Sequence, residues 1–380
     1  MNKTRVFFSA TLSIIVLLLA LSISAITPLH MAVMNSINQA AAATPDSKLA
    51  VQIDEFANKL VKMNLFSGAI LVAKDGRAIL SKGYGMANLD LDVPNAPRTK
   101  YRLGSITKSF TAIAVMQLQQ QGKLSVKDLV CKYVDPCPEA WNAITIYHLL
   151  THTSGLQNYM ELSGYTGLKR AGATPETIIA LFRDLALSFP PGKQFGYSSS
   201  NYVVLGSVIE TVTGKRYGVV LQDQILKPLA MNATGLDRNQ FVVKNRAEGY
   251  ISQNVKADYI NMSAAFASAD MYSTVEDLLI LDQALYTSKV LSKAQLDEMF
   301  MPAVKAEFGD GEEMYSGYGW FNDQVLSHHR IENRGGVEGF RSALHRFPDD
   351  RITVIVLSNF ETVDAHIVAE QIEQLLFAQK

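Results

Sequence analysis

Segments typical of β-strands stand at the two ends of this chain, and segments typical of helices fill the stretch between them. Near the start, two apolar runs at 68–73 and 77–85 flank Asp75-Gly76, a pair that favours a tight hairpin turn. Near the end, 340–347 and 351–358 are two further strand-like runs joined by a short polar turn. This order predicts an α+β fold, in which an antiparallel sheet built from both ends of the chain is packed by helices and accompanied by a central helical lobe.

Helical periodicity and end signals locate the helices of the chain. Pro175 directly after Thr174 is typical of a helix start, and Gly214 directly after Thr213 is typical of a helix end. No repeat and no interdomain linker interrupts the sequence after residue 48, so 44–380 is expected to be a single domain. The helices are predicted over residues 44–65, 105–121, 145–150, 175–187, 202–213, 275–285 and 365–377.

The first 43 residues carry an export signature. Lys3 and Arg5 precede an uncharged apolar run over 6–26, which at about 20 residues is long enough to cross a bilayer as a helix. Two interpretations stay open. Ala40–Ala43 offers a small-residue cleavage site, which would make 1–43 a signal peptide and the protein secreted. Without cleavage, the same run would associate with the cytoplasmic membrane and anchor the rest of the chain to its outer face.

Composition excludes one class of partner and suggests one covalent bond. The 380 residues hold 35 Lys and Arg against 36 Asp and Glu, a net charge of −1, with no cluster of basic residues. Binding to phosphates needs clustered positive charge, so no nucleic-acid partner is expected. The two cysteines, Cys131 and Cys137, flank a short turn-forming segment. In an oxidising compartment they could form a local disulfide, which would staple this loop and not the whole fold.

Ser105-Ile-Thr-Lys108 is the motif that points most directly to chemistry. At the start of a predicted helix, side chains three residues apart lie on one face, so the lysine amine can reach the serine hydroxyl. A serine hydroxyl is a weak nucleophile until a neighbouring base takes its proton. The free N–H groups of a helix start favour developing negative charge, and Gly104 lets a substrate backbone come close. A capping serine beside a solvated lysine would give the same pattern, so the motif needs its context.

Further segments supply that context, because they occur together and in a fixed order. They are Gly68-Ala-Ile-Leu-Val-Ala-Lys-Asp-Gly76, Tyr101-Arg-Leu-Gly-Ser-Ile-Thr-Lys-Ser-Phe-Thr111, Leu149-Leu-Thr-His-Thr-Ser-Gly155, Pro191-Gly-Lys-Gln-Phe-Gly-Tyr-Ser-Ser199, Pro228-Leu-Ala-Met231, Gly317-Tyr-Gly-Trp320 and Gly335-Gly-Val-Glu-Gly-Phe340. With these segments, the chain resembles the family of serine β-lactamases, penicillin-binding proteins and related esterases, in particular its class C-like branch, over about residues 67–360. The resemblance implies the β-lactamase/transpeptidase-like fold for 44–380.

The resemblance also implies a role for each catalytic position. Ser105 would be the nucleophile that becomes acylated, and Lys108 would accept its proton. Tyr197 matches the tyrosine of the family's second motif, Tyr-x-Asn, and would carry the proton to the leaving group. The backbone N–H groups of Ser105 and Gly336 would form the oxyanion hole. No metal ion and no organic cofactor is expected.

Two motif positions depart from the family pattern. The second motif ends in Ser199 where relatives have Asn, and a serine reaches less far than an amide, so contacts to a substrate amide are expected to differ. The third motif, Lys-Thr-Gly or His-x-Gly in relatives, aligns with Asn333-Arg-Gly335, and Asn333 cannot carry a positive charge. Arg334 or the nearby Arg330 could supply that charge for a substrate carboxylate. The candidate substrate-binding residues are therefore Ser199, Asn333, Arg334 and Gly335.

We therefore expect a serine hydrolase that acts through an acyl-enzyme on an amide or ester carbonyl. Candidate substrates are D-alanyl peptides of the cell wall (peptidoglycan), β-lactams and small esters, among which the fold does not choose. A small-ester esterase or a D-amino-acid amidase of the same fold is one alternative, which Asn333 favours. A cell-wall-binding protein with weak or no turnover is an alternative of another class, which Ser199 and Asn333 keep open.

For the histidines, structural roles fit the sequence better than metal binding or catalysis. His148 and His152 are four residues apart, a spacing that suits two metal ligands on a helix. No third ligand is arranged near them, and His152 belongs to the family's structural Thr-His-Thr-Ser-Gly turn, so we predict no metal site there. His328-His329 is interpreted as part of a solvated loop.

Overall fold

The computed structural model describes residues 48–308 and 313–378. The apolar run at 6–26, the Ala40–Ala43 segment and the first four residues of the predicted helix at 44–65 lie outside these residues. Within the described residues, none of the helices combines the length and the apolar character that crossing a bilayer requires. The chain from Pro45 onward forms one compact unit.

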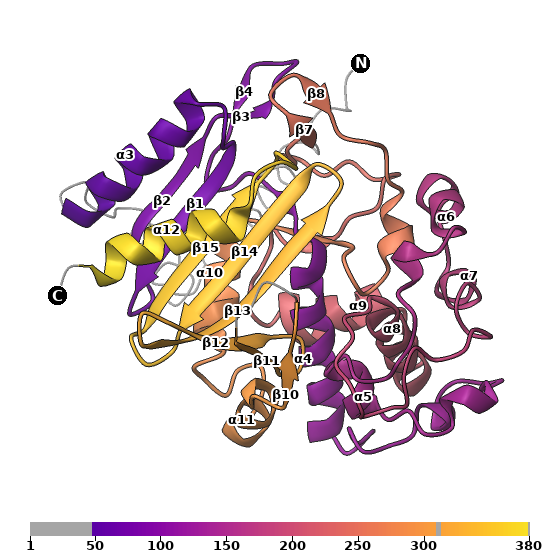
Figure 1. Ribbon diagram of the computed structural model, residues 1–380. Coiled ribbons are helices and arrows are strands. Elements are labelled where there is room, and N and C mark those ends of the chain that lie inside the picture. The colour runs from indigo at the N-terminus through magenta and orange to yellow at the C-terminus, as the bar shows by residue number, and fades with distance from the viewer. Residues whose placement is uncertain (1–47, 309–312, 379–380) are drawn as a thin grey trace, which may run out of the picture. The chain divides into compact units, whose positions relative to one another are not determined.

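An eight-stranded antiparallel sheet is the centre of the fold (Figure 1). Its order is β10-β11-β12-β13-β14-β15-β1-β2, so strands from the start and the end of the chain lie side by side. This arrangement confirms the predicted α+β fold with a sheet built from both ends. The strands are β1 (Gly68–Lys74), β2 (Arg77–Tyr84), β10 (Val304–Ala306), β11 (Met314–Ser316), β12 (Phe321–Val325), β13 (His328–Val337), β14 (Phe340–Phe347) and β15 (Ile352–Ser358).

Two terminal helices, α3 (Lys48–Lys62) and α12 (Ala365–Phe377), cover one face of this sheet (Figure 1). The Asp364 side chain begins α12 by accepting the backbone N–H groups of His366 and Ile367. The bounds of α12 agree with the prediction, and α3 begins and ends within the predicted range.

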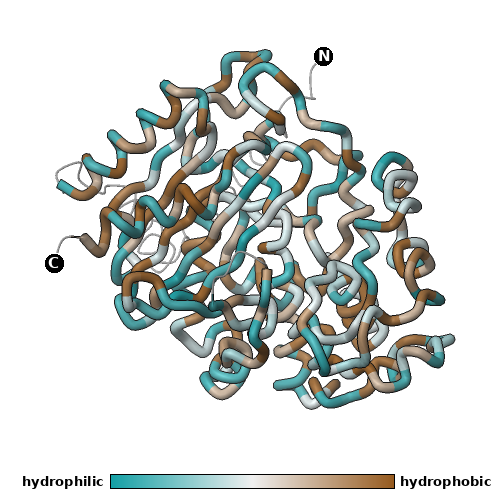
Figure 2. Tube along the Cα trace, viewed as in Figure 1, coloured by the Kyte–Doolittle hydropathy of each residue, from teal (hydrophilic) through white to brown (hydrophobic). Residues whose placement is uncertain are grey.

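The strands β1 and β15 are buried on both faces, and hydrophobic residues run along them (brown in Figure 2). Alternate side chains of β1 reach opposite cores. Ala69 and Leu71 join the core shared with the helical lobe, whereas Ile70 and Val72 join the core under the two terminal helices. A strand covered on both faces has no polar side, which explains the continuous apolar runs near both ends of the sequence.

The chain between β2 and β10 forms the helical lobe, with three small sheets. Its helices include those predicted at 105–121, 145–150, 202–213 and 275–285, each within a few residues. The helical turns and helices are η1 (Gly104–Ile106), α4 (Thr107–Gln120), η2 (Val130–Lys132), η3 (Glu139–Trp141), α5 (Ile146–Leu150), η4 (Tyr159–Glu161), α6 (Tyr165–Ala171), α7 (Pro175–Ile179), α8 (Ser200–Thr213), α9 (Tyr217–Leu221), η5 (Gln222–Leu226), η6 (Met262–Ala265), α10 (Val275–Ala284) and α11 (Lys293–Phe300). The small sheets contain β3 (Met86–Asn88), β4 (Val93–Pro94), β5 (Tyr101–Arg102), β6 (Gly235–Leu236), β7 (Tyr250–Ser252), β8 (Val255–Lys256) and β9 (Met271–Ser273).

The helix predicted over 175–187 is wrong in its second half. Thr174 begins it as expected, but α7 ends at Ile179 and the chain continues through tight turns. The ring of Phe182 is buried and stacks on Trp141, with centroids 5.9 Å apart. Packing of this ring against a distant segment outweighs the local helical pattern.

Strands β10 to β13 were not predicted, and His328-His329 is not the solvated loop that the sequence suggested. Both histidines belong to β13, and the ring of His328 stacks on Phe377 of α12. The β13 sequence is rich in charged residues and glycine, and it lacks the apolar alternation that identifies a strand. It still forms a strand because its charged side chains are paired inside the fold.

Cys131 and Cys137 are joined by a disulfide bond. They lie six residues apart and close a short loop beside the helical lobe, where both partly buried side chains pack against the main core. The bond therefore fixes one loop of the lobe and links no distant elements.

Candidate active site

Ser105 lies where the sheet meets the helical lobe, in the turn η1 that leads from β5 into α4. Gly104, just before it, has a φ of 54°, a left-handed conformation that suits glycine. A Cβ atom on Gly104 would lie 2.5 Å from the backbone nitrogen of Gly336 in β13. Glycine at this position therefore brings the start of the helix and the edge of β13 into direct contact.

The hydroxyl of Ser105 lies between two polar groups. Lys108 donates a hydrogen bond from Nζ to Ser105 Oγ over 3.0 Å, and Tyr197 donates one from its hydroxyl over 2.8 Å. The lysine comes from α4 and the tyrosine from the loop before α8, 92 residues from the serine. Ser105 is half-buried, so its oxygen stays within reach of a substrate.

Lys108 is buried, with 2% of its surface exposed. Besides Ser105, its ammonium group donates to the Ser199 hydroxyl over 3.3 Å and to the Ser268 carbonyl over 3.0 Å. These three acceptors are all uncharged oxygens. Lys108 is therefore oriented by dipoles, and it points at Ser105 rather than at a carboxylate.

The ring of His152 packs against Tyr197. It stacks on the phenol ring, with the two centroids 4.4 Å apart. The imidazole is buried, and its Nδ1 atom accepts the backbone N–H of Ser198 over 3.2 Å. Burial lowers the pKa of His152 well below its usual value, and the positive charge of Lys108 lowers this pKa further. The His152 ring that packs against Tyr197 is thus neutral.

The backbone of Gly336 lies against Gly104, directly before Ser105. Gly335 makes this approach of β13 tight, because a Cβ atom there would lie 1.9 Å from the Leu103 carbonyl oxygen. The two glycines thus let a strand edge lie directly against the turn that carries Ser105. This is the arrangement in which an oxyanion hole of two backbone donors can form.

Two residues expected to contact substrate are buried in internal contacts instead. Ser199 is 3% exposed and its hydroxyl contacts Lys108. Asn333 is also 3% exposed, and its amide donates to the Ser109 hydroxyl and to the Gly319 carbonyl, each over 2.8 Å. Both side chains therefore connect elements that surround Ser105, and their expected contacts with substrate stay a prediction.

The two arginines considered for a substrate carboxylate lie in different environments. Arg330 is 1% exposed and pairs with Asp323 and Glu373, so it cannot face a substrate. Arg334 is about a third exposed and lines a groove of about 740 Å³ that is also lined by Gly335 and Gly336. The charged residues and the histidine that line this groove are Arg334, Glu338, Arg341, Glu361, Asp364 and His366.

On its other side, the site has an aromatic wall. Phe308 and Phe321 lie beside Tyr197, with ring centroids 6.1 and 6.5 Å from the phenol, and Phe195 completes the cluster. Phe308 is 47% exposed. An apolar substrate group next to the reacting carbonyl would have a surface to contact here.

Some contributors to the site carry no sequence signal. The Ser268 carbonyl, 160 residues from Lys108, and the Ser109 hydroxyl, 224 residues from Asn333, meet their partners only through the fold. His152 could have been suspected from its motif, but its stack on Tyr197 could not. His148 and His152 do not form a helical pair, because α5 ends at Leu150 and the ring of His148 is used to cap its start.

This arrangement has the parts of a serine acyl-transfer site: a hydroxyl between a lysine and a tyrosine, next to two backbone N–H groups, at the junction of a sheet and a helical lobe. Comparison with known proteins agrees. A family model described as Beta-lactamase matches residues 53–377. The chain therefore belongs to the Beta-lactamase family, a family of serine hydrolases.

Individual relatives cover most of the chain. A Bacillus subtilis penicillin-binding protein is 28% identical over 334 residues, which are 83% of this chain and 73% of the relative. The octameric penicillin-binding protein homologue from Pyrococcus abyssi has a TM-score of 0.78 and 28% identity, over 87% of this chain and 77% of its own. A D-stereospecific amidohydrolase from Streptomyces sp. has a TM-score of 0.72 and 25% identity, over 87% and 99%.

Proposed function

We propose that Ser105 is the nucleophile of this hydrolase and that Lys108 and Tyr197 move its proton. The observation that carries the proposal is the position of Ser105 Oγ, 3.0 Å from Lys108 Nζ and 2.8 Å from the Tyr197 hydroxyl. Either group accepts the serine proton when it is itself unprotonated. Both remain within reach of the leaving group that must later receive that proton.

The reaction then proceeds through two tetrahedral intermediates. Ser105 Oγ attacks the carbonyl carbon, and its proton passes to Lys108 or Tyr197 while the carbonyl oxygen takes the negative charge. The N–H groups of Ser105 and Gly336 stabilise that oxyanion. Collapse breaks the bond to the amine or alcohol, which leaves with the proton, and an ester to Ser105 remains. Water attacks this ester in the same way and releases the acid.

We further propose a short peptide with a D-amino acid at the cleaved amide as the substrate class. Arg334 lines the groove that Gly335 and Gly336 also line, where it is suited to a substrate carboxylate. Phe308 offers an exposed aromatic surface on the acyl side. The similarity to penicillin-binding proteins and to a D-stereospecific amidohydrolase supports the same class.

The test compares the full-length wild type with the Ser105→Ala variant. Both receive a D-alanyl-D-alanine peptide, a D-amino-acid amide, a chromogenic cephalosporin and a nitrophenyl ester. Turnover is followed together with intact mass, which detects a covalently bound acyl group. We expect Ser105→Ala to lose the adduct and to reduce kcat by about 10⁴-fold or more.

Ser81→Ala is the matched control, since Ser81 lies on β2 and its hydroxyl has no hydrogen-bond partner among the described residues. It should behave as wild type. Full turnover by Ser105→Ala would remove Ser105 from the mechanism. An adduct that persists without turnover would identify a penicillin-binding protein, and an ester preferred over every amide would identify an esterase.

Arg334 is tested with a matched pair of substrates. Replacing Arg334 with Gln should raise KM about 10-fold or more for a peptide with a free carboxylate, because a charge-assisted pair is lost. The same peptide with an amidated end should be affected little. Equal changes for both peptides would show that Arg334 does not bind the carboxylate.

A further inference from the structure

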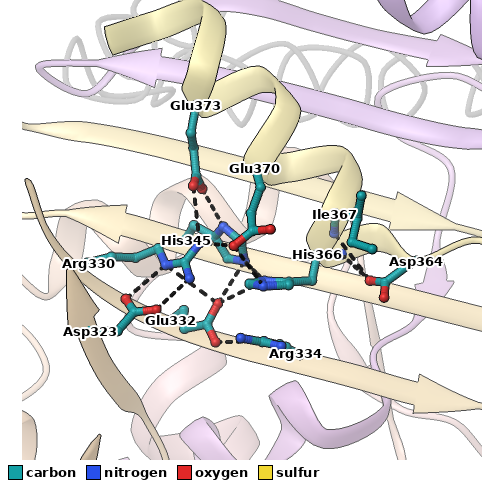
Figure 3. A network of polar contacts seen from close by, with 10 residues as sticks. All are labelled: Asp323, Arg330, Glu332, Arg334, His345, Asp364, His366, Ile367, Glu370 and Glu373. Atoms are coloured by element: carbon teal, nitrogen blue, oxygen red, sulfur yellow. Dashed lines mark hydrogen bonds and ion pairs between the residues drawn. The ribbon is translucent and has the colours of Figure 1, made fainter. Parts of the chain in front are cut away.

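A buried network of charged side chains lies where β13 and β14 meet α12, on the face of β13 opposite to Asn333 (Figure 3). Glu332 and His345 are directly opposite each other in the β13–β14 pair, and His366 comes from the first turn of α12. Their side chains are buried, at 0%, 0% and 5% exposed. The proposed reaction uses none of them.

Three atoms of these residues converge on one point. Glu332 Oε2 lies 3.0 Å from His345 Nε2 and 3.1 Å from His366 Nδ1, and the two ring nitrogens are 3.0 Å apart. Metal bonds of about 2.0–2.2 Å to each of three such atoms give ligand–metal–ligand angles of roughly 85–100°. Two histidines and one carboxylate on one face of an ion are a known ligand set for divalent transition metals.

Both ring nitrogens lie within ion-pair distance of Glu332 Oε2. Two ring nitrogens that face each other can share only one proton. Glu332 Oε2 is fully buried, and its neighbours at this point are the two ring nitrogens. A buried charge must be paired or must coordinate a metal, and an ion bound between these three atoms would be coordinated by the carboxylate.

The remaining atoms of the three side chains are held as the outer contacts of a metal site usually are. His345 Nδ1 contacts Glu373, and His366 Nε2 lies 3.0 Å from Glu370 Oε1. Glu332 Oε1 accepts a hydrogen bond from Arg334 Nε over 2.7 Å. Carboxylates on the far nitrogens of histidine ligands fix the ring orientation and raise the basicity of the ligand.

The charge of the network suits a divalent cation. With neutral imidazoles, four carboxylates face two guanidinium groups, which leaves a net charge of −2. One divalent ion balances this charge. The members are Asp323, Glu332, Glu370, Glu373, Arg330 and Arg334, with His345 and His366 between them.

The groove beside the candidate active site adjoins this network. His366 and Arg334 line the groove of about 740 Å³ that also passes Gly336. The groove therefore touches both the histidine from α12 and the outer contact of Glu332.

We propose that Glu332, His345 and His366 bind one divalent transition-metal ion, with Zn²⁺ as the probe. The ion ties β13 to β14 and to α12 behind the strand that carries Gly335 and Gly336. Its role is to fix the position of this strand. It does not contact the reacting carbonyl, since the ligands point to the opposite face of β13 from Asn333.

The experiment uses the full-length protein, freed of metal with a chelator and then titrated with Zn²⁺. Metal content after desalting is measured by mass spectrometry, and Co²⁺ is used as a spectroscopic probe. We expect one ion per chain, visible-range absorption bands for the Co²⁺ form, and a rise in Tm when Zn²⁺ is added. A wild type that retains no ion after desalting would overturn the proposal, and the two imidazoles would then hold protons in its place.

Variants decide whether the ion sits at these residues. His366→Asn and His345→Gln should each weaken Zn²⁺ binding by more than the roughly 100-fold that loss of an outer contact costs, and should abolish the rise in Tm. His329→Gln is the matched control, since His329 lies on β13 but outside the three-ligand set. Circular dichroism checks that each variant is folded. Unchanged affinity in a folded His366→Asn variant would place the ion elsewhere and overturn the proposal.

Discussion

In the proposed mechanism, Ser105 depends on two neighbours that reach it from different parts of the chain. Lys108 is one helical turn away, while Tyr197 arrives from the loop before α8 and rests on the His152 ring. Three side chains that act as a unit give non-additive losses when they are removed singly. The role of each residue is therefore tested best by comparing the loss of kcat/KM for different substrates, and not by the size of the loss for a single substrate.

Replacing Tyr197 with Phe removes the hydroxyl that lies 2.8 Å from Ser105 Oγ. An amine must gain a proton in order to leave, whereas a nitrophenolate leaves without one. We expect kcat/KM for an amide substrate to fall by about 10²- to 10⁴-fold and for a nitrophenyl ester to fall less. Steady-state kinetics on the two substrates measure the difference.

Tyr286→Phe serves as the control for this prediction. Among the described residues the Tyr286 hydroxyl has no hydrogen-bond partner, so its removal should leave both rates unchanged. Equal losses on amide and ester in Tyr197→Phe would argue against proton delivery to the leaving group.

The neutral His152 ring makes stability depend on pH in a defined direction. Burial holds its folded-state pKa well below the ordinary value of 6.5, so below about pH 6.5 the unfolded chain binds a proton that the folded chain does not. Stability should therefore be present above pH 6.5 and fall as the pH drops below it, by at most about 1.4 kcal/mol per pH unit from this residue.

Urea unfolding between pH 7 and pH 5 tests this contribution by comparing wild type with His152→Asn. Asparagine tolerates the left-handed backbone at this position, where φ is 57°, and it has no proton to gain. The free energy of unfolding should decline less steeply with falling pH in the variant. Parallel pH curves would mean that His152 is not the responsible group.

Among the elements, β13 makes different contacts on its two faces. One face meets α4 through Asn333, and the other carries Glu332 and Arg334 into the charged network under α12. Gly335 and Gly336, at the end of the strand, lie against the turn that holds Ser105. In the proposed mechanism, the position of the oxyanion hole therefore depends on contacts on both sides of a single strand.

Replacing Asn333 with Ala should lower both stability and turnover. The variant loses two hydrogen bonds of 2.8 Å and leaves the Ser109 hydroxyl and the Gly319 carbonyl without this donor. We expect the free energy of unfolding to fall by about 1–3 kcal/mol. Because Asn333 holds β13 in place, kcat should fall more than KM changes.

Denaturant unfolding and steady-state kinetics measure these two effects. Asn254→Ala is the control, since Asn254 is exposed between β7 and β8 and should change stability by no more than about 0.5 kcal/mol. A variant at Asn333 that raises KM and leaves kcat intact would restore the direct role in substrate binding.

At the scale of the whole molecule, α10 is joined to the central strands of the sheet by a buried polar contact. Asp282 of α10 accepts hydrogen bonds from Arg346 of β14 and from Thr353 of β15. The Arg346 guanidinium also lies over the ring of Trp320, 5.9 Å from its centroid. This contact links a helix of the middle of the chain to the sheet formed by its ends.

Replacing Asp282 with Ala leaves the Arg346 charge buried without this carboxylate. Breaking a buried ion pair in this way costs about 3–5 kcal/mol of unfolding free energy, which denaturant unfolding measures. Asp297→Ala removes an exposed pair with Lys293 and should cost no more than about 0.5 kcal/mol. Similar costs for the two variants would contradict the importance of burial here.

Much of the site follows from motifs, because short spacings on a helix and turn residues carry local information. Ser105, Lys108, Tyr197 and Gly336 are all singled out in this way, and the structure brings them together. The supporting contacts are different. The Ser268 carbonyl and the Ser109 hydroxyl act on partners 160 and 224 residues away, and no local pattern marks such pairs.

Local sequence signals were enough to predict four of the eight strands of the main sheet, most of the helices and the family. Apolar periodicity, turn residues and motif order are local properties, so they can be recognised before the chain folds. Only the tertiary structure decided that Asn333 and Arg330 face inward and that Glu332, His345 and His366 converge. The physical reason is that strand register and helix docking set these contacts, and both depend on packing between segments far apart in the chain.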